Sequence, residues 1–201
     1  GIPHLAYQLI HADIIVDGEI RDVYLCASDD FKEKGESKIA LDAYKEREEY
    51  EAESALDFCV RKGWEDYIYQ MLVVDYLILN RDRHGANIEV LRNSRKKTFR
   101  MAPLFDHGLS LLCRCMSDRQ IDTFDVMEDK PCNNYIGSKS TWENLKLIPA
   151  DKRPMLNPLC ETDRERIMEG LDGIISEVLQ DKIWEMIWKR WCAYEDFCNS
   201  R

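Results

Sequence analysis

The chain of 201 residues has little glycine, no long apolar run and no excess of basic side chains. Its nine glycines are widely spread, and none forms the Gly-x-Gly-x-x-Gly pattern of many nucleotide-binding loops. No apolar run reaches the roughly 18 residues that a membrane-spanning helix needs, so we expect no membrane segment. Residues 1–16 carry three ionisable groups and no basic start. We therefore expect no secretory signal peptide there.

The cysteines and the net charge restrict the class of protein further. Eight cysteines are scattered without a disulfide-like spacing, so we expect reduced thiols and a cytoplasmic location. The net charge is −10, which argues against nucleic acid as a partner because phosphate backbones require a basic face. One dense basic cluster, residues 92–97 with Arg100, falls on a predicted hairpin turn. We interpret it as a solvated tip.

Composition and periodicity predict an α+β fold that is mainly helical. The hydrophobic content of 45% is enough for one globular core. Residues 4–10 and 20–27 read as strands joined by an Asp-Gly turn, and residues 88–91 and 98–102 read as a second hairpin. The predicted helices cover an exposed, acidic segment from residue 44 to about 61, a buried segment at 64–79, and residues 142–147, 163–169 and 174–198.

The most informative motif is Asn-Arg-Asp-Arg-His-Gly-Ala-Asn at residues 80–87, followed by Phe-Asp-His-Gly at 105–108. Phosphoryl transfer needs a carboxylate to orient the nucleophile and oxygen ligands to hold Mg²⁺ against a triphosphate. Asp82 fits the first requirement, and Asn87 and Asp106 fit the second. The alternative is an ordinary polar loop without a catalytic role, because Asn, Asp, Gly and His are common turn residues. The order of buried helix, loop, hairpin and aspartate favours the phosphoryl-transfer reading.

Residues 75–87 and 101–111 resemble the HipA-like kinases of bacteria. The core Asp-Arg-His-x-x-Asn is also similar to the catalytic loop of phosphatidylinositol kinases. The resemblance implies a protein-kinase-like large lobe at residues 32–201, preceded by a remnant of the small-lobe sheet and hinge at 1–31. It implies an ATP-dependent serine/threonine kinase that uses Mg²⁺.

The resemblance also assigns roles to individual residues. Asp82 would be the catalytic base, and Asn87 and Asp106 would be catalytic residues that hold the metal and thereby the cofactor. The adenine would contact the hinge, at Leu25, Cys26, Ala27 and Ser28. The alternative for residues 1–31 is a simple hairpin that binds no ligand. The partners would be ATP, a protein substrate with a hydroxyl acceptor and, as in many HipA-like pairs, an antitoxin-like protein. No nucleic acid or membrane is expected.

Three residues around the catalytic motif complete these expectations. Asp75 ends a buried helix, and we favour a hydrogen bond from the loop over exposure to water. Asn80 is expected to shape the loop. His84 is expected to act as a structural hydrogen-bonding residue rather than as a second base.

Two parts of a complete kinase are not recognisable, namely the glycine-rich loop and the strand lysine that contacts ATP. The chain is then a fragment of a longer kinase, a short protein completed by another chain, or a catalytically degenerate interaction protein. In the last case, the acidic residues 46–53 and the tryptophan-rich C-terminal helices would bind the partner. A lipid kinase is a further alternative, and the net charge of −10 disfavours it at a membrane surface.

Overall fold

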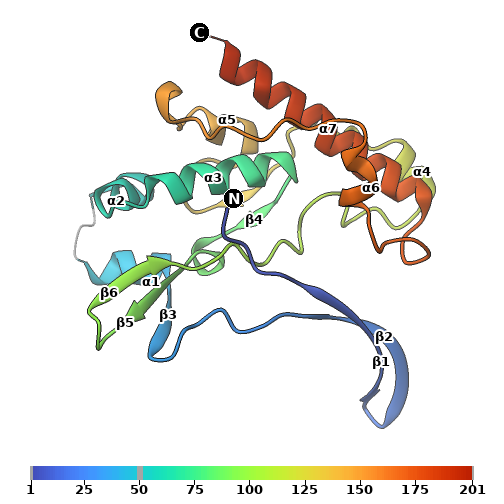
Figure 1. Ribbon diagram of the computed structural model, residues 1–201, viewed down its shortest axis with the longest axis horizontal. Coiled ribbons are helices and arrows are strands. Elements are labelled where there is room, and N and C mark those ends of the chain that lie inside the picture. The colour runs from blue at the N-terminus through green and yellow to red at the C-terminus, as the bar shows by residue number, and fades with distance from the viewer. Residues whose placement is uncertain (1, 49–51, 201) are drawn as a thin grey trace.

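The computed structural model describes residues 2–48 and 52–200 of the chain (Figure 1). The strands are β1 (Gln8–Val16), β2 (Glu19–Ala27), β3 (Glu36–Ala40), β4 (Asp82–Arg83), β5 (Glu89–Asn93), β6 (Thr98–Met101) and β7 (Asn133–Asn134). The helices are α1 (Leu41–Arg47), α2 (Ala55–Arg61), α3 (Glu65–Leu77), α4 (Asp118–Asp122), α5 (Thr141–Leu145), α6 (Asp163–Ile167) and α7 (Glu177–Asn199). Short 3-10 turns lie at Gly85–Asn87 and Ala150–Lys152.

Strands β1 and β2 form the antiparallel hairpin that the Asp-Gly turn predicts. Asp17 and Gly18 both have positive φ, 53° and 84°, as a two-residue turn of this hand requires. Among the described strands, β1 and β2 pair only with each other, and the hairpin extends away from the rest of the molecule (Figure 1). Most of its large apolar side chains are therefore exposed, with Ile15 at 76% and Ile20 at 74%.

A three-stranded antiparallel sheet has the order β3-β5-β6. The hairpin of β5 and β6 is predicted from the sequence, but β3 is not, because it is five residues long and carries two charged side chains. Its pairing with β5 brings Glu36 opposite Asn93. Arg100 on β6 then forms an ion pair with Glu36, Nη2 to Oε2 2.7 Å. Arg100 is therefore not part of a solvated tip.

The single acidic helix predicted from residue 44 to about 61 is wrong in its extent, because two shorter helices lie there. α1 ends at Arg47, the described residues 48 and 52–54 are not helical, and α2 starts after a new N-cap at Ser54. The Ser54 hydroxyl accepts a hydrogen bond from the backbone N–H of Asp57, 3.0 Å, which ends the preceding segment and begins the helix. Residues 49–51, in the middle of the predicted helix, lie outside the described residues.

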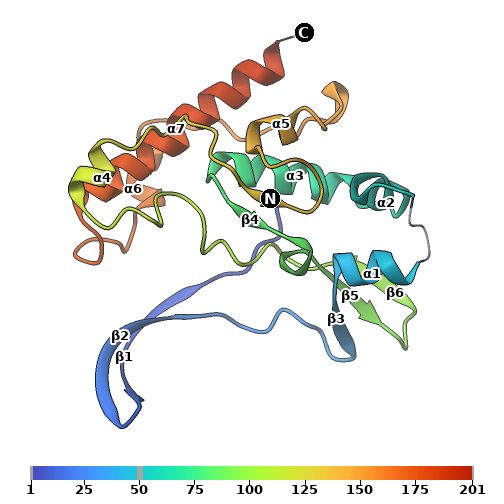
Figure 2. The same ribbon diagram turned by 180° about the vertical axis from the view of Figure 1, so that it is seen from behind.

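Helix α3 is the centre of the main core, as the apolar stripe predicts. Its buried apolar residues are Ile68, Tyr69, Met71, Leu72, Val73 and Tyr76. In Figures 1 and 2, α1 and the three-stranded sheet lie on one side of α3. Helices α5 and α7 lie on its other side. The C-terminal helices are also confirmed, with α7 the longest at 23 residues. Within residues 2–48 and 52–200, no helix has the length and apolar character that crossing a bilayer requires.

Candidate functional site

The motif at residues 80–87 forms a tight loop between α3 and β5. Asn80 fixes its start, because the side-chain amide donates to Asp75 Oδ1 at 2.9 Å and the side-chain oxygen accepts from the N–H of Asp82 at 3.2 Å. The predicted role of Asn80 is confirmed. Gly85 is required for a close approach, since a Cβ there would lie 2.4 Å from an Asp42 carboxylate oxygen. The loop thus packs directly against α1.

Arg83 connects the loop to the segment that carries Asp106. Its guanidinium forms a bidentate ion pair with Asp75, with Nη2 to Oδ1 at 2.8 Å and Nε to Oδ2 at 3.0 Å. Nη1 donates to the carbonyls of Asn87, 3.1 Å, and Phe105, 2.9 Å. Burial lowers the pKa of Arg83, but the Asp75 carboxylate outweighs this and raises it overall. Asp75 therefore accepts the predicted hydrogen bonds from the loop.

Asn87 is buried, and its side chain is oriented by the loop itself. The Nδ2 group donates to the carbonyl oxygen of Asp82 at 2.9 Å. The side-chain oxygen has no hydrogen-bond partner within residues 2–48 and 52–200. An amide held in this way presents a hard oxygen, which is a ligand type that Mg²⁺ accepts.

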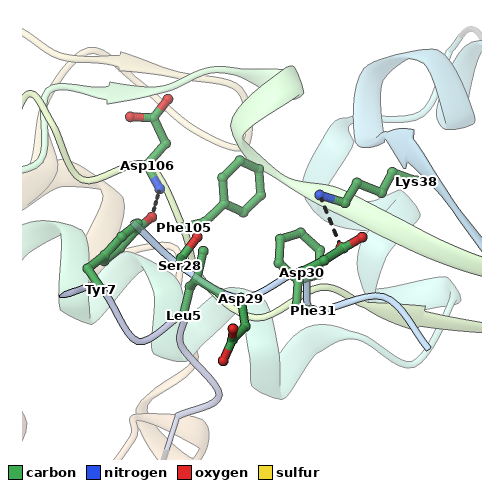
Figure 3. A pocket seen from close by; sticks show the side chains of 9 residues that line it. All are labelled: Leu5, Tyr7, Ser28, Asp29, Asp30, Phe31, Lys38, Phe105 and Asp106. Atoms are coloured by element: carbon green, nitrogen blue, oxygen red, sulfur yellow. Dashed lines mark hydrogen bonds and ion pairs between the residues drawn. The ribbon is translucent and has the colours of Figure 1, made fainter. Parts of the chain in front are cut away.

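Asp106 has a left-handed backbone, with φ of 52°. Its N–H donates to the Tyr7 hydroxyl at 2.9 Å, which ties this segment to the N-terminal part of the chain (Figure 3). Its carboxylate is exposed and has no ion pair or hydrogen bond to any described residue. A strained residue with an unpaired carboxylate at a cavity is typical of a functional position.

A cavity of about 430 Å³ lies beside Asp106. Its lining residues come from three separate parts of the chain, namely Leu5, Tyr7, Ser28, Asp29, Asp30, Phe31, Lys38, Phe105 and Asp106 (Figure 3). Of the four predicted hinge residues, only Ser28 lines it. Leu25, Cys26 and Ala27 lie in β2, paired with β1, and do not line the cavity.

The comparisons with known proteins concern the fold. No protein-family model and no curated protein matches the sequence. The structure is similar to the crystal structure of the Helicobacter pylori proinflammatory kinase CtkA, with a TM-score of 0.63. The match covers 94% of this chain and 73% of that chain, at 15% sequence identity. The chain has a kinase-like fold. The prediction from the motif is confirmed at this level, and membership of the HipA-like family stays a prediction.

Seven of the nine residues that line the cavity were not predicted as site residues, among them Phe31, Phe105 and Lys38. Phe31 and Phe105 stack with ring centroids 5.8 Å apart, and the Lys38 ammonium lies 3.9 Å from the Phe31 ring (Figure 3). Lys38 also lies 3.9 Å from an Asp30 oxygen and 4.0 Å from Glu89 Oε2. Burial raises the pKa of Glu89. No local signal marked Lys38, because the strand that carries it, β3, is itself not evident from the sequence.

Asp82 is flanked by two side chains on its carboxylate. The Asn133 amide donates to Oδ1 at 3.3 Å, and His84 Nε2 lies 3.9 Å from Oδ2. The side chain of His84 makes no hydrogen bond to any described residue. The prediction that His84 is a structural hydrogen-bonding residue is therefore wrong.

Metal binding can be tested against the side chains present. In the described part of the chain, no group of three or more His, Cys, Asp or Glu side chains is arranged to hold a metal ion. The predicted ligands Asn87 and Asp106 would instead supply one amide oxygen and one carboxylate. Mg²⁺ is often bound by one or two protein ligands together with substrate phosphates and water. The two side chains fit that chemistry.

Proposed function

We propose that this protein is a HipA-like, Mg²⁺- and ATP-dependent serine/threonine protein kinase. The observation that carries the proposal is the double link made by Arg83. One guanidinium nitrogen binds the backbone carbonyls of Asn87 and of Phe105, the residue before Asp106, and so links the two segments that carry the predicted metal residues. The kinase-like fold supports the same conclusion.

The residues of the loop would then have separate roles. Asp82 would accept the proton of the acceptor hydroxyl, and Asn87 and Asp106 would hold Mg²⁺. When bound, Mg²⁺ would neutralise charge on the phosphates of ATP. Arg83 would act only through position, because its guanidinium is buried and fully engaged with Asp75 and the two carbonyls.

ATP would occupy the cavity beside Asp106. Its volume of about 430 Å³ lies in the usual range for small-molecule sites. Phe31 and Phe105 offer aromatic surface to the nucleobase, and Ser28 lies where the hinge was expected. Lys38 supplies a cation at the end of the cavity formed by Asp30 and Phe31. Within this proposal, residues 1–31 belong to a small-lobe sheet and hinge, and 32–201 to a large lobe.

The partners in this proposal are ATP and a protein with a hydroxyl acceptor. An antitoxin-like protein is a further partner that the HipA-like resemblance implies. A second candidate function is an interaction protein with a kinase-like fold and no catalysis. The exposed apolar side chains of the β1–β2 hairpin favour that candidate, because such surface commonly marks a protein interface.

Two measurements test the proposed kinase. Calorimetric titration with ATP should give heat only when Mg²⁺ is present, and transfer of labelled phosphate to protein should follow. Asp82→Asn should lower transfer by at least about a hundredfold, since general-base catalysis contributes that much or more. Asp122→Asn, an exposed carboxylate on α4, is the matched control and should leave transfer unchanged. Absence of both heat and transfer would reject the kinase and favour the interaction protein.

A further inference from the structure

A segment distant in sequence is joined to the strand that carries Asp82. β7 (Asn133–Asn134) pairs in parallel with β4, and Asn133 lies opposite Asp82. The N–H of Asn133 donates to the Arg81 carbonyl at 2.9 Å, and that of Tyr135 to the Arg83 carbonyl at 2.9 Å. Arg81 Nε returns a hydrogen bond to the carbonyl of Pro131 at 3.1 Å. Backbone hydrogen bonds to the residues before and after Asp82 therefore fix the position of Asn133 relative to the proposed base.

The side chain of Asn133 faces Asp82 from this strand. Its amide nitrogen donates to Oδ1 of the carboxylate at 3.3 Å, and both residues are open to solvent on one side. No other described side chain donates a hydrogen bond to this carboxylate, and His84 is 3.9 Å from the second oxygen. A carboxylate that receives one amide N–H keeps its second oxygen available as an acceptor.

We propose that Asn133 is a positioning residue for phosphoryl transfer, acting through the hydrogen bond that its amide donates to Asp82. This inference rests on the proposed function. The Asn133 amide holds Oδ1, so that Oδ2 faces the acceptor hydroxyl. As the acceptor oxygen bonds to the γ-phosphorus, the bond from that phosphorus to the bridging oxygen of ADP breaks. The hydroxyl proton moves to Asp82 Oδ2, and ADP leaves with the bond electrons.

The neighbouring residue offers a matched control. Asn134 has the same side chain on the same short strand, but its side-chain oxygen accepts the N–H groups of Ile136, 2.9 Å, and Gly137, 3.1 Å. A carboxylate at position 134 can still accept both bonds. A carboxylate at position 133 has no proton to donate and repels Asp82. Asn133→Asp and Asn134→Asp therefore add the same charge at adjacent positions, and only the first acts on Asp82.

Steady-state kinetics test the inference. Asn133→Asp should lower kcat about tenfold or more while KM for ATP stays within about twofold, because misplacing a catalytic group costs rate more than substrate binding. Asn133→Ala should lie between Asn133→Asp and the wild type. Asn134→Asp should keep both constants within about twofold of the wild type. An active protein in which Asn133→Asp and Asn134→Asp have the same kcat would overturn the inference.

A second measurement does not depend on turnover. In a proton–nitrogen NMR spectrum, the side-chain amide signal of Asn133, identified by its loss in Asn133→Ala, should shift in Asp82→Ala and stay in place in Asp122→Ala. An unshifted signal would show that the amide does not bind Asp82, and would also overturn the inference. A wild-type protein that transfers no phosphate, yet shows the shift, overturns the proposed function and with it the role of Asn133 in transfer.

Discussion

Arg83 and Asp75 form an ion pair in the interior, with Nη2 to Oδ1 at 2.8 Å and side chains only 1% and 2% exposed. Asp75 lies on helix α3, and Arg83 directly follows Asp82 in the short strand β4. The pair therefore connects the main core to the proposed active site. A buried charge without its partner is costly, so the two residues depend on each other.

Asp75→Ala should strongly destabilise the protein, because it leaves the Arg83 guanidinium buried and unpaired. We expect the free energy of unfolding to fall by about 3–5 kcal/mol, measured by urea denaturation. Glu143→Ala breaks the exposed ion pair with Lys146 and serves as the control. It should cost less than about 1 kcal/mol. Equal effects of the two substitutions would contradict the importance of the buried pair.

Arg190 should stabilise the segment that leads to β7. Its buried guanidinium donates to the carbonyls of Val126, 2.7 Å, Tyr76, 3.1 Å, and Glu128, 3.0 Å. Arg190→Met removes all three bonds and should cost at least about 2 kcal/mol, since hydrogen bonds from charged groups are individually worth about 1.5–3 kcal/mol.

Hydrogen exchange identifies which part of the chain Arg190→Met destabilises. Amides near residues 124–134 should exchange faster in Arg190→Met, because these carbonyls lose their anchor on α7. Lys189→Met, at the exposed neighbouring position, should change neither the stability nor the exchange appreciably. Exchange that is unaltered in this segment would show that Arg190 does not hold it.

The eight cysteines should divide by reactivity. Burial raises the pKa of Cys59 to about 12 and that of Cys132 to about 11, which suppresses the reactive thiolate. Cys26, Cys113 and Cys160 are exposed. Brief treatment with iodoacetamide, followed by peptide mass spectrometry, should modify the three exposed thiols first. Modification of Cys59 in the folded protein, at a rate similar to Cys26, would contradict the complete burial of Cys59 in the core.

The Glu36–Arg100 pair should make stability depend on pH in the acidic range. The hydrogen bond from Arg100 lowers the pKa of Glu36 below its ordinary value of 4.5. The folded state therefore favours the carboxylate, and the stabilisation is complete above pH 4.5 and decreases as the pH falls through the lower, folded-state pKa. Unfolding free energies of wild type and Glu36→Gln should differ most at neutral pH and converge in acid.

A control for this pH series is Glu19→Gln, on the exposed hairpin. It should change the free energy of unfolding by less than about 0.5 kcal/mol at neutral pH. A difference between wild type and Glu36→Gln that stays constant from neutral to acidic pH would exclude the carboxylate of Glu36 as its source.

Local signals in the sequence predict much of this structure. The turn at Asp17 and Gly18 and the apolar stripe of α3 are properties of adjacent residues, and both are found as expected. The loop that carries Asp82 and Asn87 is recognisable because its residue types and spacing match those that the proposed phosphoryl transfer requires. These features need no knowledge of distant parts of the chain.

Other features depend on contacts between distant residues and are not evident from the sequence. β3 exists because it pairs with β5, and its charged residues resemble those of a helix or loop. Asn133 contacts Asp82 across 51 residues, from a segment that looks like any surface connection. Lys38 lines the cavity because β3, which carries it, pairs with β5, and Phe31, in the segment before β3, stacks on Phe105. Pairing over such separations is a property of the folded chain and leaves no periodic pattern.

The left-handed backbone of Asp106 has a consequence for mutational work. Residues without a short polar side chain adopt this conformation at a cost of roughly 1 kcal/mol or more. Asp106→Ala would therefore remove the carboxylate and also strain the main chain. A loss of activity in this variant would then have two causes. Asparagine tolerates the same dihedral angles, so Asp106→Asn is the substitution that isolates the charge.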